Sequence, residues 1–434
     1  MGHTTAKDTY AKLRERLDRY PVGAPGQSTI FEILKTIYTE DDAAIACRMP
    51  LRFSSLKTLS QRTGIDAPLL EEKLDAMAGK GIVMDIRRGD DARYILNPTI
   101  VGFFEFSMMR IRDEGEIDQK KLAGLFHRYM LEEADFAEQF SSKTRTTPFR
   151  TLVHENTLPE NYSEVLDWER ATHVVNTAGR WAVGICHCRH VMHHMGRDCS
   201  VFRMEDSCLS LGPSVDYLVR HSFAREIDRE GAAALLEESR DAGMVHICDN
   251  VQRRPTFICN CCGCCCEVLN SFKNFRIFGN TFSSNFLAEV DRDECTGCLE
   301  CVKACPVDAI DRVAEERVIK GKKRKYIPRV DESVCLGCGV CAITCKNSAM
   351  QMKPRPKRRI APESAFARVI TMAIEQEKLQ DMLFDADAGA GGFISKAFVG
   401  AVLSLPPAKQ LLAVDAVKSR FVSYVVSMMS GKKK

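Results

Sequence analysis

Apolar and polar residues at the start of the chain follow helical spacing first and strand spacing afterwards. Residues 1–26 predict one amphipathic helix, which Pro21 and Gly23 end. Residues 27–100 then predict three helices and two short strands, over the ranges 29–37, 54–63, 68–80, 82–87 and 93–96. We therefore expect a small helical domain that carries a β-hairpin.

This order of elements resembles a winged helix, whose recognition helix would be residues 68–80. A helix that enters the major groove is expected to be basic, because neutralising phosphates supplies much of the affinity. Around this helix acidic side chains outnumber basic ones, with Asp66, Glu71, Glu72 and Asp75 against Lys73 and Lys80. We therefore expect this winged-helix-like domain to dock a protein, and nucleic-acid binding is not expected.

Helical spacing continues beyond this domain until the cysteines begin. Residues 101–180 predict a helical connector, and residues 181–286 mix strand-like runs with helical stretches. Residues 287–353 form a compact unit that contains a basic insertion at 320–325. We expect the insertion either at a solvent-exposed hairpin tip or at a docking site for an acidic electron-transfer partner.

The C-terminal segment, residues 354–434, predicts a basic linker and a helical tail with a glycine-rich hinge at 389–392. Its most apolar stretch, residues 393–405, contains Lys396 and is too short to span a bilayer. No transmembrane span is therefore expected, while peripheral association with a membrane stays open.

Cysteine content separates this chain from an ordinary globular protein. Apolar residues make up 45% and charged residues 27% of the 434 positions, and the net charge of +3 favours no particular partner. All of the 20 cysteines except Cys47 lie between residues 186 and 345. No secretory signal opens the sequence, so we expect a cytoplasmic protein whose thiols stay reduced and free to bind metal.

Eight of these cysteines form a duplicated motif with the spacing C-x2-C-x2-C-x3-C, at residues 295–305 and 335–345. In such motifs three cysteines bind one [4Fe-4S] cluster and the fourth binds the other. The predicted ligands are Cys295, Cys298, Cys301 and Cys345 for cluster I, and Cys335, Cys338, Cys341 and Cys305 for cluster II. Residues 287–352 resemble the dicluster bacterial ferredoxins, although Lys346 stands where the second motif usually has proline.

A second cysteine set lies upstream, and we expect it to bind one or two further iron–sulfur clusters. Its ten candidate ligands are Cys186, Cys188, Cys199, Cys208, Cys259, Cys261, Cys262, Cys264, Cys265 and Cys266. Cys186 and Cys188 are expected to cap one cluster together with Cys199 and Cys208.

The last six of these cysteines crowd into the run 259–266. If this run is extended, alternation places Cys259, Cys261 and Cys265 on one face and Cys262, Cys264 and Cys266 on the other. A helical turn would divide them differently, and both arrangements stay open.

Histidines in the same region offer an alternative to iron. His187, His190, His193 and His194 follow closely on Cys186. A mixed Cys/His zinc site is one interpretation. Hydrogen bonding of these side chains to cluster sulfurs, with Arg189 tuning the charge, is another, and solvated loop histidines are the third.

The order of segments is similar to a group of iron–sulfur proteins from anaerobes. Those proteins join a winged-helix-like N-terminus, a C-x-C-R segment, a CNCCxCCC run and a terminal dicluster ferredoxin, and the resemblance spans most of residues 20–350. It implies redox work and names no substrate. Cys261-Cys262-Gly263 is also similar to one Cys-Cys-Gly motif of heterodisulfide-reductase-type subunits, which use such motifs in pairs.

The predicted fold class is α+β multidomain, with winged-helix-like, cysteine-rich and ferredoxin-like dicluster domains followed by C-terminal helices. We expect an electron-transfer protein that relays low-potential electrons through several [4Fe-4S] clusters to or from a partner oxidoreductase. No nucleotide-binding glycine motif is present, so any flavin would belong to that partner complex. Two alternatives remain: catalytic reduction of a disulfide-type acceptor at the 186–266 site, and a redox-sensing DNA-binding regulator.

Overall fold

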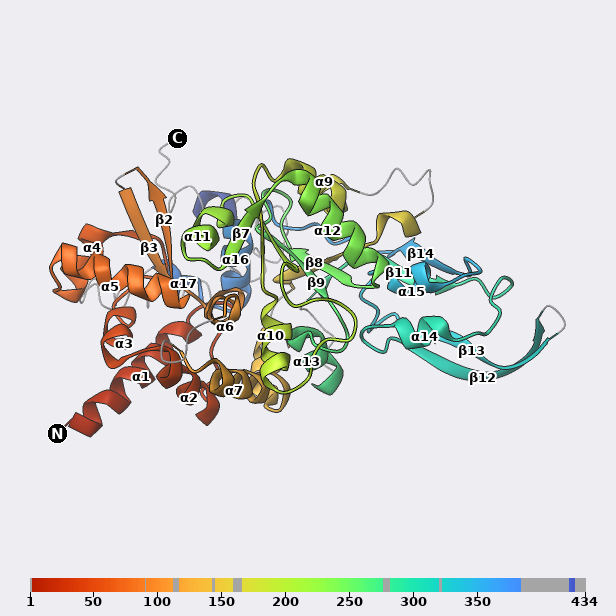
Figure 1. Ribbon diagram of the computed structural model, residues 1–434, viewed down its shortest axis with the longest axis horizontal. Helices are drawn as coiled ribbons and strands as arrows, with labels where there is room; N and C mark the ends of the chain where they lie inside the picture. Colours follow the sequence, from red (N-terminus) through yellow and green to blue (C-terminus); the bar gives the residue numbers. More distant parts are fainter. Residues whose placement is uncertain are drawn as a thin grey trace. The chain divides into compact units, whose positions relative to one another are not determined.

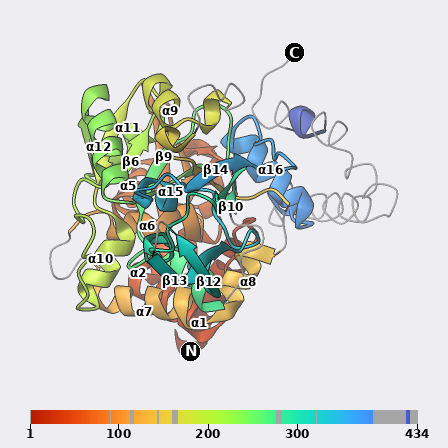
Figure 2. The same ribbon diagram turned by 90° about the vertical axis from the view of Figure 1, so that its right-hand side faces the viewer.

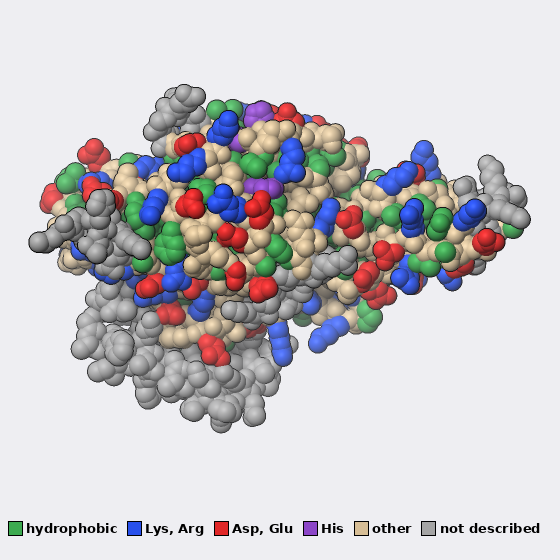
Figure 3. Space-filling model, turned by 90° about the horizontal axis from the view of Figure 1, so that it is seen from below, with side chains coloured by type: hydrophobic (Ala, Val, Ile, Leu, Met, Phe, Trp, Pro, Cys, Tyr) green, Lys and Arg blue, Asp and Glu red, His purple; other side chains and the backbone are tan. Residues whose placement is uncertain are grey.

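The computed structural model describes residues 2–89, 91–111, 117–142, 145–158, 166–275, 282–319, 322–383 and 421–425. The chain divides into two compact units, each drawn from several segments. The first unit combines residues 1–146, 216–223 and 365–434, and the second combines residues 147–215 and 224–364. Figure 3 shows positive and negative side chains interspersed on one face, which agrees with the small net charge.

The first unit consists mainly of helices around a small antiparallel sheet (Figure 1). Its helices are α1 (Gly2–Asp18), α2 (Ser28–Ile37), α3 (Glu40–Ala46), α4 (Leu56–Thr63), α5 (Ala67–Lys80), α6 (Phe104–Met108), α7 (Gln119–Leu131), α8 (Ala134–Ser142), α16 (Ala365–Glu375) and α17 (Leu379–Leu383). Its strands are β1 (Ser54–Ser55), β2 (Val83–Arg88) and β3 (Asp91–Leu96), in the order β1-β3-β2.

Local signals explain where the central helices of this unit begin and end. Ser55 caps α4 by accepting a hydrogen bond from the Thr58 backbone N–H. The helix ends at Gly64, whose left-handed φ of 74° favours glycine. The three helices and the hairpin predicted within residues 27–100 are therefore present, with α3 and β1 as additions. Their identification as a winged helix stays a prediction.

The second unit contains a seven-stranded sheet with the order β10-β4-β8-β9-β6-β5-β7. The strands are β4 (Phe149–Leu152), β5 (Trp181–Gly184), β6 (Cys208–Leu211), β7 (Ala224–Ile227), β8 (Val245–Asp249), β9 (Phe257–Cys261) and β10 (Phe282–Ser283). Neighbouring strands are antiparallel except for the parallel pair β10 and β4. The helices of this region are α9 (Ala171–Thr177), α10 (His187–His194), α12 (Arg229–Asp241) and α13 (Glu267–Phe275), while α11 (Ser214–Arg220) crosses the boundary between the units.

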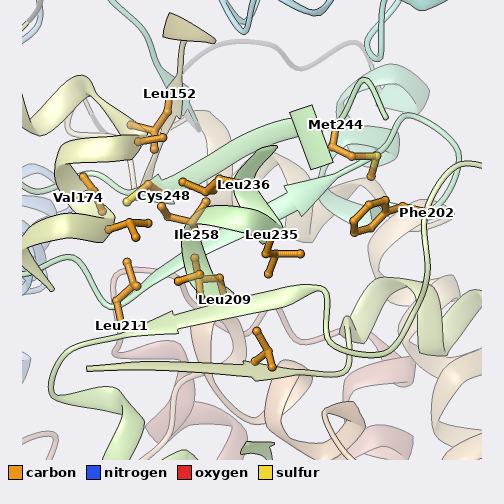
Figure 4. Packing of buried hydrophobic residues seen from close by; sticks show 14 of the residues in the cluster. Leu152, Val174, Phe202, Leu209, Leu211, Leu235, Leu236, Met244, Cys248 and Ile258 are labelled. Carbon is orange, nitrogen blue, oxygen red and sulfur yellow. The ribbon is translucent and has the colours of Figure 1, made fainter. Parts of the chain in front are cut away.

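The core of this sheet lies beneath α9 and α12. Figure 4 shows Val174 of α9 and Leu235 of α12 directed toward strand residues such as Leu209 and Ile258. Cys262 and Cys265 belong to the same buried cluster, so part of the thiol-rich run is anchored in an apolar core. The run 259–266 thus begins within β9 and continues past its end into this core.

The rest of the second unit is a smaller substructure with two short helices and two strand pairs. Strands β11 (Phe286–Val290) and β14 (Met350–Pro354) pair with each other, and α14 (Glu300–Ala304) contacts α15 (Val340–Thr344). A long hairpin formed by β12 (Ile310–Ile319) and β13 (Lys322–Val330) extends from it (Figures 1 and 2). Residues 322–325 of the basic insertion form the start of β13, and residues 320–321 lie outside the described part of the chain.

The compact units group the expected segments differently, and the expected domain boundaries stay a prediction. The segment 101–180 is not helical throughout, because β4 joins the large sheet between α8 and α9, and the chain enters the second unit at residue 147. The segments 181–286 and 287–353, expected as separate domains, lie in one compact unit. The glycine hinge at 389–392 and the apolar stretch 393–405 lie outside the described residues.

Candidate metal centres

The four predicted ligands of cluster I surround an open hollow in the smaller substructure. Cys295, Cys298, Cys301 and Cys345 line this hollow of about 340 Å³ together with the apolar side chains of Val290 and Met350. Cys295 and Cys298 lie in the loop before α14, Cys301 lies in α14 itself, and Cys345 follows α15. The turn before α14 requires a left-handed φ of 62° at Leu299, which directs the flanking cysteines toward the same space.

A second hollow of about 320 Å³ repeats this arrangement. It is lined by the four predicted ligands of cluster II, Cys305, Cys335, Cys338 and Cys341. Each hollow therefore takes three thiols from one motif and the fourth from the other, which is the exchange that the spacing predicts. Burial raises the pKa of Cys338 to about 12, so only a bound cation would hold all four thiols as thiolates.

Six upstream thiols form a connected chain of sulfur contacts, which we call the six-thiol group. Its members contact one another in the order Cys208, Cys259, Cys261, Cys266, Cys188 and Cys186. Cys208 stands opposite Cys259 in the register of β6 and β9. Cys261 lies two residues further along β9, on the same face.

The other three members of the six-thiol group lie at the N-terminal ends of helices. Cys186 and Cys188 lie at the start of α10, and Cys266 directly precedes α13. The Cys266 sulfur accepts backbone hydrogen bonds from Val268 and Leu269, at the positive end of the α13 dipole. Contact with Cys188 also holds the pKa of Cys266 well below its usual value. Such thiolates are the metal-binding form of cysteine.

The remaining four thiols form a separate, tighter set, which we call the four-thiol group. It consists of Cys199, Cys262, Cys264 and Cys265, whose Sγ atoms all lie within 4.8 Å of one another. Cys199 lies 3.7 Å from both Cys262 and Cys264, and Cys264 lies 3.6 Å from Cys265. Cys265 holds the pKa of Cys262 down at about 5 despite its burial.

The alternating division expected for an extended run is therefore wrong. Cys265 lies in the four-thiol group and Cys266 in the six-thiol group, the reverse of their expected faces. The physical reason is that β9 ends at Cys261, after which the chain makes a helical turn closed by the Cys266 N–H to Cys262 C=O hydrogen bond of 3.2 Å. Cys199 also separates from Cys186, Cys188 and Cys208, with which it was expected to cap one cluster.

Arg189 lies buried between the two upstream thiol groups, with 2% of its surface exposed. Its guanidinium donates hydrogen bonds to the Asn260 carbonyl at 3.0 Å and to Ser207 Oγ at 3.3 Å. Burial alone would lower the pKa of Arg189, but the charges of Cys186 and Cys262 outweigh it and raise that pKa. A fixed positive charge therefore faces both thiol groups.

The four candidate histidines do not form a common site. His187 binds Glu267 with an Nε2–Oε2 distance of 2.7 Å, and both side chains are buried beside Cys188. His190 and His194 lie 3.1 Å apart through their Nε2 atoms, while His193 pairs with Asp198 at the surface. Of the four, only His187 joins a potential ligand set, and Glu267 is a partner that the sequence pattern did not indicate.

Gly263 of the run 259–266 packs against the residue that follows Cys305, a predicted ligand of cluster II. A Cβ atom added to Gly263 would lie 2.7 Å from the carbonyl oxygen of Pro306, the residue after Cys305. On the same side, the backbone N–H of His154 donates to the Cys338 carbonyl at 3.0 Å. The His154 ring lies 4.7 Å from that of His246. These contacts place the two cysteine-rich parts of the unit side by side.

Two cysteines belong to none of these groups. Cys248 is fully buried in the apolar core, where burial raises its pKa to about 12. Cys47 lies in the first unit and donates its thiol proton to the Thr9 carbonyl at 3.5 Å. Both serve as internal controls for cysteine replacement.

Comparison with protein-family models assigns one segment of this chain. Residues 294–349 match the model of the 4Fe-4S dicluster domain. The searches of curated proteins and of solved structures gave no match. Among the described helices, none is long and apolar enough to cross a membrane. The matched residues include all eight cysteines that line the two hollows, and residues 294–349 are accordingly a 4Fe-4S dicluster domain that binds iron–sulfur clusters.

Proposed function

We propose that this protein relays electrons between a redox partner and an additional iron–sulfur centre, through the two clusters of its dicluster domain. Cys295, Cys298, Cys301 and Cys345 would hold cluster I, and Cys305, Cys335, Cys338 and Cys341 would hold cluster II. The additional centre would be held by the six-thiol group. Bound iron–sulfur clusters supply uptake and release of single electrons at potentials set by their surroundings.

The observation that carries this proposal is the contact between Gly263 and Pro306. Pro306 follows a cluster II ligand, and Gly263 lies two residues from Cys261 and three from Cys266 of the six-thiol group. Electron transfer between centres requires close approach, and the absence of a side chain at residue 263 allows it. Cluster II is therefore the member of the dicluster domain that faces the additional centre, which gives the order cluster I, cluster II and six-thiol centre.

The surroundings of the six-thiol group support a charged redox centre there. The N-termini of α10 and α13 both meet its sulfurs, and the Arg189 guanidinium is held beside it. These positive ends would stabilise the negative charge of a thiolate-bound cluster, most strongly in its reduced state. The buried pair of His187 and Glu267 lies next to Cys188 and would orient the start of α10.

The N-terminal hairpin region favours a protein partner over nucleic acid. Three basic side chains of α5 and β2 are already paired with acids: Lys73 with Asp41 at 3.3 Å, Lys80 with Asp42 at 2.7 Å, and Arg87 with Asp75 at 2.6 Å. Paired cations release few counterions from DNA. Leu69 of α5 is half exposed and would contribute to a docking face.

A freeze-quench experiment tests the relay. The anaerobically purified full chain is given a substoichiometric one-electron reductant, and electron paramagnetic resonance follows reduction of the additional centre. Replacing Cys335 by Ser should remove cluster II and slow or abolish that reduction, whereas Cys47→Ser should leave it unchanged. An unchanged rate in Cys335→Ser would mean that the additional centre does not receive its electrons through cluster II.

A further inference from the structure

The four-thiol group differs from the other cysteine sets in how closely its sulfurs approach. Its Sγ atoms all lie within 4.8 Å of one another, with three separations of 3.6–3.7 Å. A single ion bound by four thiolates at about 2.3 Å would separate neighbouring sulfurs by about 3.8 Å, the edge of the coordination tetrahedron. Three of the six sulfur–sulfur separations therefore match the edge of such a tetrahedron, and the others are at most 4.8 Å.

The dicluster domain provides a comparison within the same chain. Its two sets of four cysteines each line an open hollow. None of those eight described cysteines belongs to a set of three whose sulfurs lie within 4.8 Å of one another. A cubane takes one cysteine at each of four separate irons and so keeps its ligand sulfurs far apart, which the four-thiol group does not.

We propose that Cys199, Cys262, Cys264 and Cys265 bind one mononuclear tetrathiolate ion. Four thiolate ligands in a closed tetrahedron select zinc or a single iron. The site would be distinct from the electron-relay centres, although it shares the run 259–266 with the six-thiol group. This assignment does not depend on the proposed relay, because it concerns a different set of thiols.

The surroundings fit such an ion and suggest what it does. Cys262 and Cys265 are buried in the core beneath the sheet, and only Cys264 is exposed. An ion bound to four thiolates carries a net negative charge, and the buried Arg189 guanidinium contacts Cys199 and offsets it. By joining the 196–206 loop to the turn at 262–265, the ion would cross-link two segments that lie far apart in the chain.

Metal and sulfide analysis of the full chain, purified anaerobically, tests this site. Cys264→Ser is the informative variant because Cys264 is the exposed ligand, and Cys47→Ser is the matched control. We expect Cys264→Ser to lower zinc, or iron without accompanying sulfide, by about one ion per chain, while acid-labile sulfide stays constant. Loss of sulfide together with iron would overturn the assignment in favour of a multi-iron cluster.

X-ray absorption on the unaltered protein gives a second test that does not depend on the stability of a variant. If the ion is zinc, we expect the zinc-edge spectrum to show four sulfur neighbours at about 2.3 Å. If it is iron without sulfide, we expect the same four neighbours at the iron edge. Nitrogen or oxygen neighbours would contradict the proposal. The proposal would also be contradicted if Cys264→Ser left the metal content unchanged and the four thiols were found as disulfides. That result would favour thiol–disulfide chemistry at this position.

Discussion

Gly263 and Pro306 meet so closely that a single methyl group does not fit between them. A Cβ atom at residue 263 would lie 2.7 Å from the Pro306 carbonyl oxygen and 3.0 Å from its Cα. Both obstacles are backbone atoms, which move only if the surrounding structure moves. This contact joins the dense cysteine run to the residue after Cys305, a predicted ligand of cluster II, and the proposed order of the centres depends on it.

Gly263→Ala should therefore move the run 259–266 away from the backbone of Pro306. We expect a loss of about 1–3 kcal/mol in the free energy of unfolding, as for other overpacked sites, together with slower reduction of the additional centre. The matched control is Gly124→Ala in α7, where an added Cβ would meet nothing within 4 Å and should stabilise by about 0.5–1 kcal/mol. Denaturant unfolding and freeze-quench kinetics check both variants, and equal behaviour of the two would contradict the contact.

Replacing a cluster I ligand should remove one cubane and leave the rest in place. Cys298 is exposed, so Cys298→Ser perturbs packing little. Because its hollow is lined by only four thiols, we expect iron and sulfide each to fall by about four atoms per chain. Iron and sulfide assays check this, with Cys47→Ser as the control; a full complement in Cys298→Ser would show that Cys298 is not a ligand.

Two neighbouring strands offer a matched pair for the six-thiol group. Cys261 of β9 lies in that group, whereas Cys248 of β8 is sealed in the apolar core. We expect Cys261→Ser to lower the iron and sulfide content. Cys248→Ser should leave both unchanged and lower the free energy of unfolding by about 1–3 kcal/mol, the cost of burying a hydroxyl. If iron were lost in Cys248→Ser and not in Cys261→Ser, the assignment of Cys261 to the six-thiol group and of Cys248 to the core would be wrong.

Asp85 in the first unit predicts a pH effect. Its carboxylate is fully buried and contacts Arg220 at 2.7 Å, His221 at 2.8 Å and Arg87 at 3.0 Å. Burial acts to raise the pKa of Asp85, but hydrogen bonds from His221, Arg220 and Arg87 together outweigh it and hold that pKa below its ordinary value. Because the folded-state pKa is depressed, this carboxylate contributes stability above the unfolded-state pKa of about 3.9 and loses it as the pH falls.

Asp85→Asn should accordingly destabilise the first unit by about 1–3 kcal/mol at pH 7, since it leaves the Arg220 and Arg87 guanidinium groups without the buried carboxylate that they contact. The difference from the unaltered protein should shrink as the pH falls below about 4. Denaturant unfolding followed by circular dichroism at several pH values measures this. A difference that stays constant or grows toward low pH would show that the charge of Asp85 is not the cause.

The parts of the site that sequence analysis could predict are those set by local spacing. Cys295 and Cys301 reach the same hollow because the residues between them form one turn into α14, and such a turn is encoded by its own short segment. The hairpin of β2 and β3 was likewise indicated by alternation around Gly89. Each of these features depends on residues that are near neighbours in the chain.

The division of the upstream thiols could not be predicted in this way. It depends on the register that sets Cys208 opposite Cys259, across 51 positions of sequence, and on the turn that carries Cys265 away from Cys266. Cys199 contacts Cys262, although the sequence around Cys199 contains no cysteine spacing that is typical of a metal-binding motif. Glu267 follows the cysteine run directly in the sequence, and only the fold shows it buried against His187.

Iron and acid-labile sulfide per chain, measured on anaerobically purified full-length protein, test the central claim most directly. The dicluster domain accounts for about eight irons and eight sulfides. If the six-thiol group holds a further iron–sulfur centre, both counts should clearly exceed eight, and the excess should disappear in Cys261→Ser. Counts of about eight in the unaltered protein, unchanged by Cys261→Ser, would contradict a relay that extends beyond the dicluster domain.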